Sequence, residues 1–373
     1  PMLSRVEELA RLNDLHSGQS TIVLVTGRRG MGKSRLLREF IGGKDAMCHV
    51  FSDLVDDLLL EDFSKTFSMY TGRPVGRFAG WSEALRAFAT DGDGKKVLIL
   101  DEFQHLLSAR PGILSEIRDF WKGRPPCDLM LILCGSGSAI GSIGTRDSPI
   151  GEHIGAHMNL GPLPFSGMYG ETDFVEDVRR YAVTGGVPAY ERRLDAPTIR
   201  GNIRTILDPS TGLFGDPLHL LNEEFNQIST YSSILSTMAD GPVNLTAVSE
   251  GTGIKATTVQ PYLTKLVNLG FVRREVPVTE PDPERSKKGM YSIADGPTRF
   301  WYRFMRPHLT ELWTNSTEGA VSDINNAIDK YVPDVFREVC RQKVMTMDLG
   351  MSKDSVGRNW DGRDSLDLVV LDR

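Results

Sequence analysis

The sequence has little of what defines several large protein classes. Its four cysteines form no CxxC pair and lie beside no pair of histidines, so neither a disulfide framework nor a zinc site is expected. No apolar run approaches the roughly 20 residues that span a bilayer. The first eight residues carry charges and lack the basic-then-apolar pattern of a signal peptide. We therefore expect a cytoplasmic protein.

The chain also lacks an excess of positive charge. Its 43 Lys and Arg residues are outnumbered by 49 Asp and Glu residues, which gives a net charge of −6. Any contact with nucleic acid must therefore come from a local basic patch. At 373 residues the chain is too long for one ordinary hydrophobic core, so two or three domains are expected.

What the first part of the chain does contain is a series of short apolar runs separated by helical patterns. The runs cover residues 21–26, 47–51, 97–100 and 129–134. Runs of this length are typical of strands buried on both faces, and their alternation with helices predicts an α/β fold with a mostly parallel sheet. Residues 135–155 are rich in Gly and Ser and are expected to form a mobile loop.

The strongest motif follows the first of these runs. Residues 27–34 match the pattern GxxxxGK followed by Ser or Thr, between a predicted strand and a predicted helix. In such a P-loop the glycines let backbone N–H groups surround a phosphate, Lys33 reaches the β- and γ-phosphates, and the Ser34 hydroxyl holds Mg²⁺. The expected nucleotide-binding residues here are Gly27, Arg28, Arg29, Gly30, Met31, Gly32, Lys33, Ser34 and Arg35.

Acidic and polar residues follow two later runs. Asp101 is expected to bind Mg²⁺, and Glu102 is expected to polarise an attacking water. The alternative is that this acidic pair caps the helix that follows. Ser136 is expected to contact the γ-phosphate, although it could equally be a loop serine. With Lys33, these residues predict an ATPase of the P-loop class that uses ATP and Mg²⁺.

These motifs and their order resemble archaeal and bacterial ATPases of the AAA/STAND-like superfamily with a C-terminal winged helix and a nuclease-like segment. The other strings that carry the resemblance are Leu3-Ser-Arg-Val-Glu-Glu-Leu9, Thr184-Gly-Gly-Val-Pro-Ala-Tyr190, Tyr291-Ser-Ile-Ala-Asp295 and Arg299-Phe-Trp-Tyr-Arg-Phe304. The resemblance implies that Arg5 lies near the nucleotide and that Pro188, in a helical lid, backs the nucleotide pocket. It also implies adenine as the base.

The sequence departs from that family near the expected active site. Ser4 replaces the usual Gly beside Arg5. His153 stands where relatives carry an arginine that could act on a neighbouring active site, and Arg146 is the nearby substitute. The resemblance therefore leaves the oligomeric state open.

A winged helix is predicted within residues 223–306. Three short helices precede two strands around a polar loop, and a third helix of this type can enter the major groove of DNA. Seven Lys and Arg against four Asp and Glu between residues 255 and 288 give a modest basic bias. The candidate contacts to duplex DNA are Lys255, Thr257, Thr258, Gln260 and Arg273. The alternatives are an internal regulatory role and a protein partner.

The C-terminal segment resembles the start of a restriction-endonuclease-like core. Glu338 and Asp367 match its metal-binding positions, whereas Ser365 replaces a glutamate and no ExK strand follows before residue 373. A metal-dependent nuclease therefore lacks its full set of residues.

Four segments are thus expected: a P-loop ATPase core at 1–164, a helical lid at 165–222, a winged-helix domain at 223–306 and an incomplete nuclease-like segment at 307–373. The expected function is ATP binding and hydrolysis that control the winged helix, with DNA as a candidate partner. Two alternatives stay open. One is a nucleotide-dependent DNA-binding or regulatory protein with negligible turnover. The other is an ATP-regulated nuclease, if residues follow the C-terminus.

Overall fold

The computed structural model describes residues 5–170, 173–209, 215–225, 227–314, 316–348, 356–362 and 364–371. The chain forms two compact units, of which the first ends at Gly161 and the second begins at Pro162. The border predicted at residue 164 lies close to this division. The finer predicted borders at residues 222 and 306 fall inside the second unit and stay predictions.

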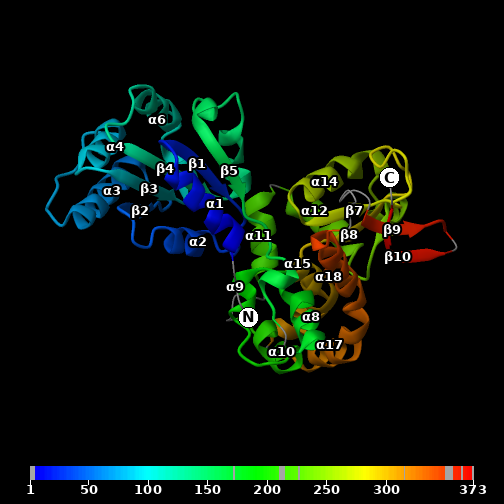
Figure 1. Cartoon of the computed structure of the whole chain (residues 1–373). Coiled ribbons are helices and arrows are strands. Elements are labelled where there is room, and N and C mark those ends of the chain that lie inside the picture. Colours follow the sequence, from blue (N-terminus) through cyan, green and yellow to red (C-terminus); the bar gives the residue numbers. More distant parts are fainter. Residues whose placement is uncertain are drawn as a thin grey trace. The chain divides into compact units, whose positions relative to one another are not determined.

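The first unit is built on a five-stranded sheet of order β2-β3-β4-β1-β5, in which every neighbouring pair is parallel (Figure 1). Its strands are β1 (Thr21–Thr26), β2 (Ala46–Val50), β3 (Lys95–Asp101), β4 (Asp128–Gly135) and β5 (Ile154–Asn159). The prediction of a parallel α/β sheet is confirmed. Because β4 lies between β1 and β3, the carboxyl ends of these three strands meet at one edge of the sheet.

Helices give the sheet its core. They are α1 (Val6–Ser17), α2 (Lys33–Phe40), α3 (Asp56–Thr71), α4 (Trp81–Thr90), α5 (Phe103–Ala109), α6 (Ile113–Lys122) and α7 (Gly137–Ile140), with 3₁₀ turns at Gly141–Gly144 and Gly151–His153. Leu24, Leu100 and Leu133 from three strands join Phe63 of α3 and Phe88 of α4 in one buried cluster. Apolar burial stabilises by about 25 cal/mol per Å². The cluster therefore holds the strands in fixed register beneath the edge where they end.

Residues 135–155 differ from the mobile loop that their composition predicts. They contain α7, two 3₁₀ turns and the start of β5. Ile140, Ile143 and Ile150 are each at most 2% exposed, so the segment is anchored in the core. The sequence pattern did not predict β5, because this edge strand alternates and buries only Ala156 and Met158 strongly.

The second unit begins with helices, as the sequence predicts. After a 3₁₀ turn at Phe165–Gly167 come α8 (Phe174–Thr184), α9 (Pro188–Glu191), α10 (Ile199–Leu207) and α11 (Asp216–Glu224). A left-handed glycine, Gly185, ends α8 (φ 59°). The Gly-Gly-Val-Pro string thus separates α8 from α9 for two reasons. Glycine stops one helix, and Pro188 starts the next.

A winged helix follows in the chain. It contains α12 (Ile228–Ser236), α13 (Leu245–Thr252), α14 (Ala256–Asn268) and a three-stranded antiparallel sheet of order β6-β8-β7. The strands are β6 (Val243–Asn244), β7 (Val272–Glu275) and β8 (Met290–Ile293). Val259, Leu263 and Leu266 of α14 are fully buried and form the inward face of this helix.

The last part of the chain is helical and then forms a hairpin. It contains α15 (Gly296–Phe300), a π-helical turn at Trp301–Met305, a 3₁₀ turn at Arg306–His308, α16 (Leu309–Trp313), α17 (Glu318–Tyr331) and α18 (Pro333–Thr346). The antiparallel pair of β9 (Val356–Trp360) and β10 (Ser365–Val370) follows. Among the described helices, none combines the length and apolar character that crossing a membrane requires.

Candidate nucleotide-binding site

The P-loop lies between β1 and α2, and its backbone requires glycine at three points. Gly30 and Gly32 have φ values of 86° and 88°, a region that glycine adopts without strain. At Gly27 a Cβ atom would lie 2.5 Å from the carbonyl oxygen of Leu160. The three motif glycines therefore each serve the shape of the loop, which leads directly into α2 at Lys33.

Lys33 is only 8% exposed although it carries a charge. Its Nζ donates hydrogen bonds to the carbonyl oxygens of Gly27 (2.6 Å) and Arg28 (3.3 Å), so the ammonium group folds back over the loop. Phosphate oxygens are stronger acceptors than these carbonyls because they carry charge. The amino end of α2 adds N–H groups and the positive end of its dipole at the same place. The loop is thus arranged to receive an anion.

The Ser34 hydroxyl donates a hydrogen bond of 2.9 Å to Oδ2 of Asp101. Ser34 is exposed in the first turn of α2, whereas Asp101, at the end of β3, is only 3% exposed. The other carboxylate oxygen, Oδ1, accepts a hydrogen bond of 2.9 Å from the backbone N–H of Glu102. Mg²⁺ takes oxygen ligands and typically one or two from the protein, the rest coming from phosphate and water. The hydroxyl and the carboxylate therefore fit this ion.

Glu102 has a strained backbone (φ 53°) and is one of two non-glycine residues with positive φ in the described chain. Such a conformation costs about 1–3 kcal/mol and is found most often at functional sites. Its carboxylate accepts a short hydrogen bond from the Gln104 side-chain amide. Although Glu102 occupies the N-cap position of α5, its side chain makes no capping hydrogen bond. The Glu102 side chain therefore gives the capping alternative no support, whereas Asp101 accepts a hydrogen bond from the backbone N–H of this N-cap residue.

Gln104 is a site residue that the sequence reasoning missed. Its Nε2 holds Glu102, and its buried Oε1 has no hydrogen-bond partner among the described residues. The sequence feature that could have identified Gln104 is its position two residues after Glu102, in the string Asp-Glu-Phe-Gln.

The end of β4 supplies the third predicted position. Ser136 is the N-cap residue of α7, and its side chain makes no capping hydrogen bond. It lies at the sheet edge between the strands that lead to the P-loop and to Asp101. Burial, and then the charge of Asp101, raise the pKa of the neighbouring Cys134 thiol far above its ordinary value. That thiol therefore stays neutral and adds no negative charge to the site.

Arg5 braces the P-loop from outside. Its Nη2 donates to the carbonyl oxygens of Met31 (2.9 Å) and Gly161 (2.5 Å), while Nη1 forms an ion pair of 2.7 Å with Glu8. The guanidinium group thus ties the loop to the end of the first unit. This contact places Arg5 beside the P-loop. Direct contact of Arg5 with a nucleotide stays a prediction.

The other P-loop side chains differ in exposure. Arg29 and Arg35 are exposed, and Arg28 is half-buried. Met31 is 2% exposed, so its side chain belongs to the core and only its backbone is available to a ligand. Pro188 lies in the second unit, where it is the buried first residue of α9. Its contact with a nucleotide stays a prediction.

The candidate DNA contacts fall into two groups. Lys255, at the N-cap of α14, and Thr257, Thr258 and Gln260 in its first turns are all exposed. Arg273 of β7, by contrast, forms a short ion pair with Glu338 of α18.

The two candidate nuclease carboxylates are bound by arginines. Glu338 pairs with Arg273 and Arg341, and Asp367 accepts a hydrogen bond of 2.7 Å from Arg337. Within the described ranges, no group of three or more His, Cys, Asp and Glu residues is placed to hold a metal ion. The nuclease-like character of this segment stays a prediction.

Comparison with known proteins agrees with these elements. The model of the AAA domain matches residues 16–140, and the model of the IclR helix-turn-helix domain matches residues 234–276. A third model, described as "Archaea bacterial proteins of unknown function", matches residues 301–373. An uncharacterized protein of Methanocaldococcus jannaschii is 26% identical over 388 residues, which cover 99% of this chain and 84% of that protein.

Two solved structures share the fold at low identity. The Walker-type ATPase of Pyrococcus abyssi matches with a TM-score of 0.58 and 18% identity, over 81% of this chain and 96% of that one. The ORC2 protein of Aeropyrum pernix matches with a TM-score of 0.52 and 15% identity, over 85% and 96%. The first unit thus has the fold and the site of a P-loop domain, and it matches the AAA domain. Along the chain this domain is followed by a match to a helix-turn-helix domain and by a C-terminal match to the family of archaeal and bacterial proteins.

The contacts of Arg5 lead to a prediction about the P-loop. Arg5→Ala should weaken ADP binding about tenfold, since the loop loses the group that fixes the Met31 carbonyl and must be ordered by the ligand instead. Calorimetric titration with ADP and Mg²⁺ measures the change. The matched control is Arg11→Ala, which removes an exposed arginine from helix α1, directly after Arg5 in the chain. Equal ADP affinities for the two variants would show that Arg5 does not order the P-loop.

Proposed function

We propose that this chain is a Mg²⁺-dependent ATPase whose nucleotide state controls its winged-helix module. One observation carries the proposal, the hydrogen bond of 2.9 Å between Ser34 Oγ and Asp101 Oδ2 at the amino end of the P-loop helix. It brings two oxygen ligands for a hard cation next to a cradle for phosphate. Adenine as the base rests on the resemblance of the chain to AAA-type ATPases.

In this proposal the chain's own residues bind and orient the triphosphate. Backbone N–H groups of the P-loop and the amino end of α2 surround the phosphates, and Lys33 exchanges its carbonyl acceptors for phosphate oxygens. Ser34 and Asp101 hold the cation. Bound Mg²⁺ supplies neutralisation of charge on the β- and γ-phosphates.

Glu102 is the proposed group that acts on water. It accepts a hydrogen bond from the water whose oxygen forms a new bond to the γ-phosphorus, while the bond from that phosphorus to the bridging oxygen breaks. The products are ADP and inorganic phosphate, and the proton of the water leaves through the Glu102 carboxylate. Ser136 is proposed to contact the γ-phosphate, because the end of β4 lies between the P-loop strand and the strand of Asp101.

One contact favours a second candidate, a nucleotide-dependent switch with negligible turnover. The Glu102 carboxylate is already bound by the Gln104 amide. If that hydrogen bond persists when ATP is bound, the carboxylate is not available to water. The chain would then change state on binding and release of nucleotide rather than on hydrolysis.

DNA is the proposed partner of the winged helix. The exposed polar residues in the first turns of α14 carry this part of the proposal, because the amino end of such a helix enters the major groove in helix-turn-helix proteins. Lys255 at its N-cap is placed to meet a phosphate. Arg273 is held by Glu338, so its contact with DNA requires that this ion pair open.

A substitution at Glu102 separates the two candidate functions. Glu102→Gln should leave ATP affinity within about twofold while lowering steady phosphate release about 100-fold or more, since an amide cannot accept the proton. Phosphate release and calorimetric ATP binding are measured on the same preparation. Glu39→Gln, an exposed position on the P-loop helix α2, is the control.

Two results would contradict this assignment. Turnover of Glu102→Gln at the parent rate would remove Glu102 from catalysis. A parent chain that binds ATP with no phosphate release, with or without duplex DNA, would favour the switch.

The DNA proposal is tested at the start of α14. Lys255→Glu should weaken binding of a fluorescent duplex about tenfold at low salt and reduce the salt dependence of the affinity, because one phosphate contact is lost. Lys330→Glu, an exposed lysine on α17, makes the same charge change elsewhere. Equal anisotropy titrations for both variants would assign the winged helix to an internal or protein contact instead.

A further inference from the structure

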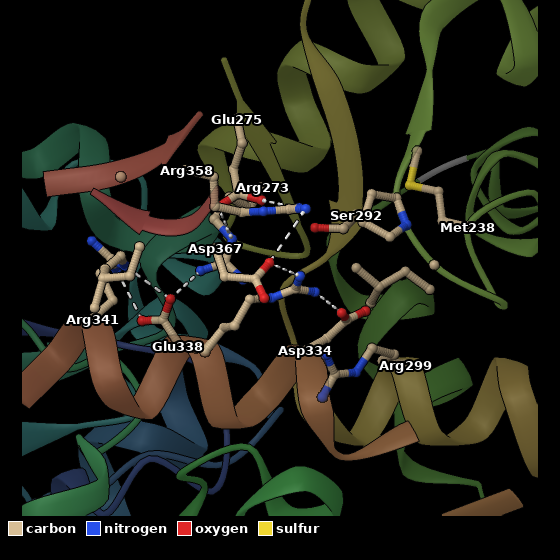
Figure 2. A pocket seen from close by; sticks show the side chains of 16 residues that line it. Met238, Arg273, Glu275, Ser292, Arg299, Asp334, Glu338, Arg341, Arg358 and Asp367 are labelled. Atoms are coloured by element: carbon tan, nitrogen blue, oxygen red, sulfur yellow. Dashed lines mark hydrogen bonds and ion pairs between the residues drawn. The ribbon is translucent and has the colours of Figure 1, made fainter. Parts of the chain in front are cut away.

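A cavity in the second unit is lined by more arginines than carboxylates. Two adjoining pockets there share Arg273, Arg299, Asp334, Glu338 and Arg341, and the larger has a volume of about 480 Å³. We call the two together the arginine cavity. Its walls come from β7, β8 and the segment after it, α15, α18, β9, β10 and the Gly-Gly-Val-Pro string. Figure 2 shows that the labelled arginines around the smaller pocket, Arg273, Arg299, Arg341 and Arg358, come from four separate elements.

The backbone at the edge of the cavity is built by close contact of two motifs. A Cβ atom on Gly296, the first residue of α15, would lie 2.5 Å from the Cα of Gly185. Gly185 itself has a positive φ of 59°. The two glycines therefore let the string at 184–190 cross the string that leads to Arg299. Both sequence motifs therefore contain a glycine at the point where they cross. Helix α15 starts at this crossing and places Arg299 in the cavity wall.

Most arginines of the cavity are matched by carboxylates. Glu338 lies between Arg273 and Arg341 and pairs with both, as the dashed lines in Figure 2 show. The other pairs join Arg273 to Glu275, Arg337 to Asp334 and Asp367, and Arg358 to Glu275 and Asp367. The lining thus holds five arginines, Arg273, Arg299, Arg337, Arg341 and Arg358, against four carboxylates, Glu275, Asp334, Glu338 and Asp367.

Arg299 takes part in none of the ion pairs between these described residues. Its Nε donates a hydrogen bond of 3.1 Å to the Tyr331 hydroxyl, and its guanidinium carbon lies 4.7 Å from the centre of the Tyr331 ring. Both contacts fix the direction of the side chain without neutralising its charge. A π-helical turn follows at Trp301–Met305, an irregularity that is frequent at functional sites. Among the residues that line the smaller pocket, arginines therefore outnumber carboxylates by one. The nearby carboxylate of Asp295, at the N-cap of α15, accepts hydrogen bonds from Thr298.

Two further donors in the cavity walls lack acceptors. The Nε atoms of Arg273 and Arg358 are buried and have no hydrogen-bond partner within the described part of the chain. A buried donor without a partner costs about 1–3 kcal/mol. An anion that entered the cavity would supply both the missing charge and the missing acceptor for Arg273, which lines the same pocket as Arg299.

We propose that the arginine cavity binds a small phosphate monoester with an apolar body. Arginine forks match phosphate oxygens with paired hydrogen bonds, and a phosphate brings several acceptors to one point. Leu163, Tyr181, Val335 and Met345 line the same pocket and provide an apolar wall for the rest of the ligand. The volume lies within the range of about 300–1,000 Å³ for small-molecule sites. Neither the P-loop nor its proposed reaction is needed for this site.

The test uses phenyl phosphate as the probe, with phenol and inorganic phosphate as comparison compounds. The full chain carries Lys33→Ala in every arm, so that the P-loop does not contribute. Phosphorus NMR titration should give a dissociation constant of about 1 mM or below for phenyl phosphate. Inorganic phosphate should bind more weakly because it gains no apolar contact, and ligand-observed proton NMR should detect no binding of phenol.

Arg299→Gln should weaken phenyl phosphate binding about tenfold or more, the value of one charge-assisted contact. Arg303→Gln is the matched control, because Arg303 lies in the same motif but forms ion pairs with Asp240 and Asp323 and does not line the cavity. The control should bind as the parent does.

A second variant keeps the test decisive if Arg299→Gln does not fold. Thr346→Glu places a carboxylate at an exposed position in the cavity lining, at the end of α18, and should weaken binding by repulsion. The proposal is overturned if phenyl phosphate does not bind, if it binds the parent and both cavity variants equally, or if inorganic phosphate binds as tightly as phenyl phosphate.

Discussion

One hydrogen bond, from Ser34 to Asp101, joins the start of the P-loop helix α2 to the end of β3, and the nucleotide site depends on this contact. It forms because β1, β4 and β3 are parallel neighbours, so that their carboxyl ends lie at the same edge although they are far apart in sequence. If β3 ran opposite to β1, Asp101 would lie at the other edge of the sheet from the P-loop. The apolar strands therefore matter for function as well as stability, because their packing decides which polar residues meet.

The sequence predicted those features that are set locally. Continuous apolar runs identified four strands. The spacing of Gly27 and Gly32 identified the P-loop, because the first approaches the Leu160 carbonyl closely and the second has a positive φ. The sequence did not predict β5, because the edge position of this strand gives an alternating pattern. It also did not predict that Gln104 binds the Glu102 carboxylate. It also gave no sign that Arg273 pairs with Glu338, 65 residues away, because that contact depends on how α18 packs beside β7.

The chain carries two places arranged for anions, and they are built differently. The P-loop uses backbone N–H groups and one lysine from a short stretch, so its motif is visible in the sequence. The arginine cavity uses side chains from β7, α15, α18 and β9, so no local sequence pattern predicts it. Arg299 and the Gly-Gly-Val-Pro string entered the prediction as parts of a family resemblance, without a stated role for the arginine. Arg273 was predicted to contact DNA, and Glu338 and Asp367 matched metal-binding positions, so none of them pointed to a shared cavity. In both places positively charged groups are held in position before any ligand is present.

The central claim is that the P-loop, together with Ser34 and Asp101, binds a nucleoside triphosphate with its cation. The most direct test is calorimetric titration of ATP with Mg²⁺ into the parent chain and into Lys33→Ala. The account predicts measurable binding to the parent and a loss of about 100-fold in affinity, or no detectable binding, for the variant. Equal affinity in the two titrations would contradict it.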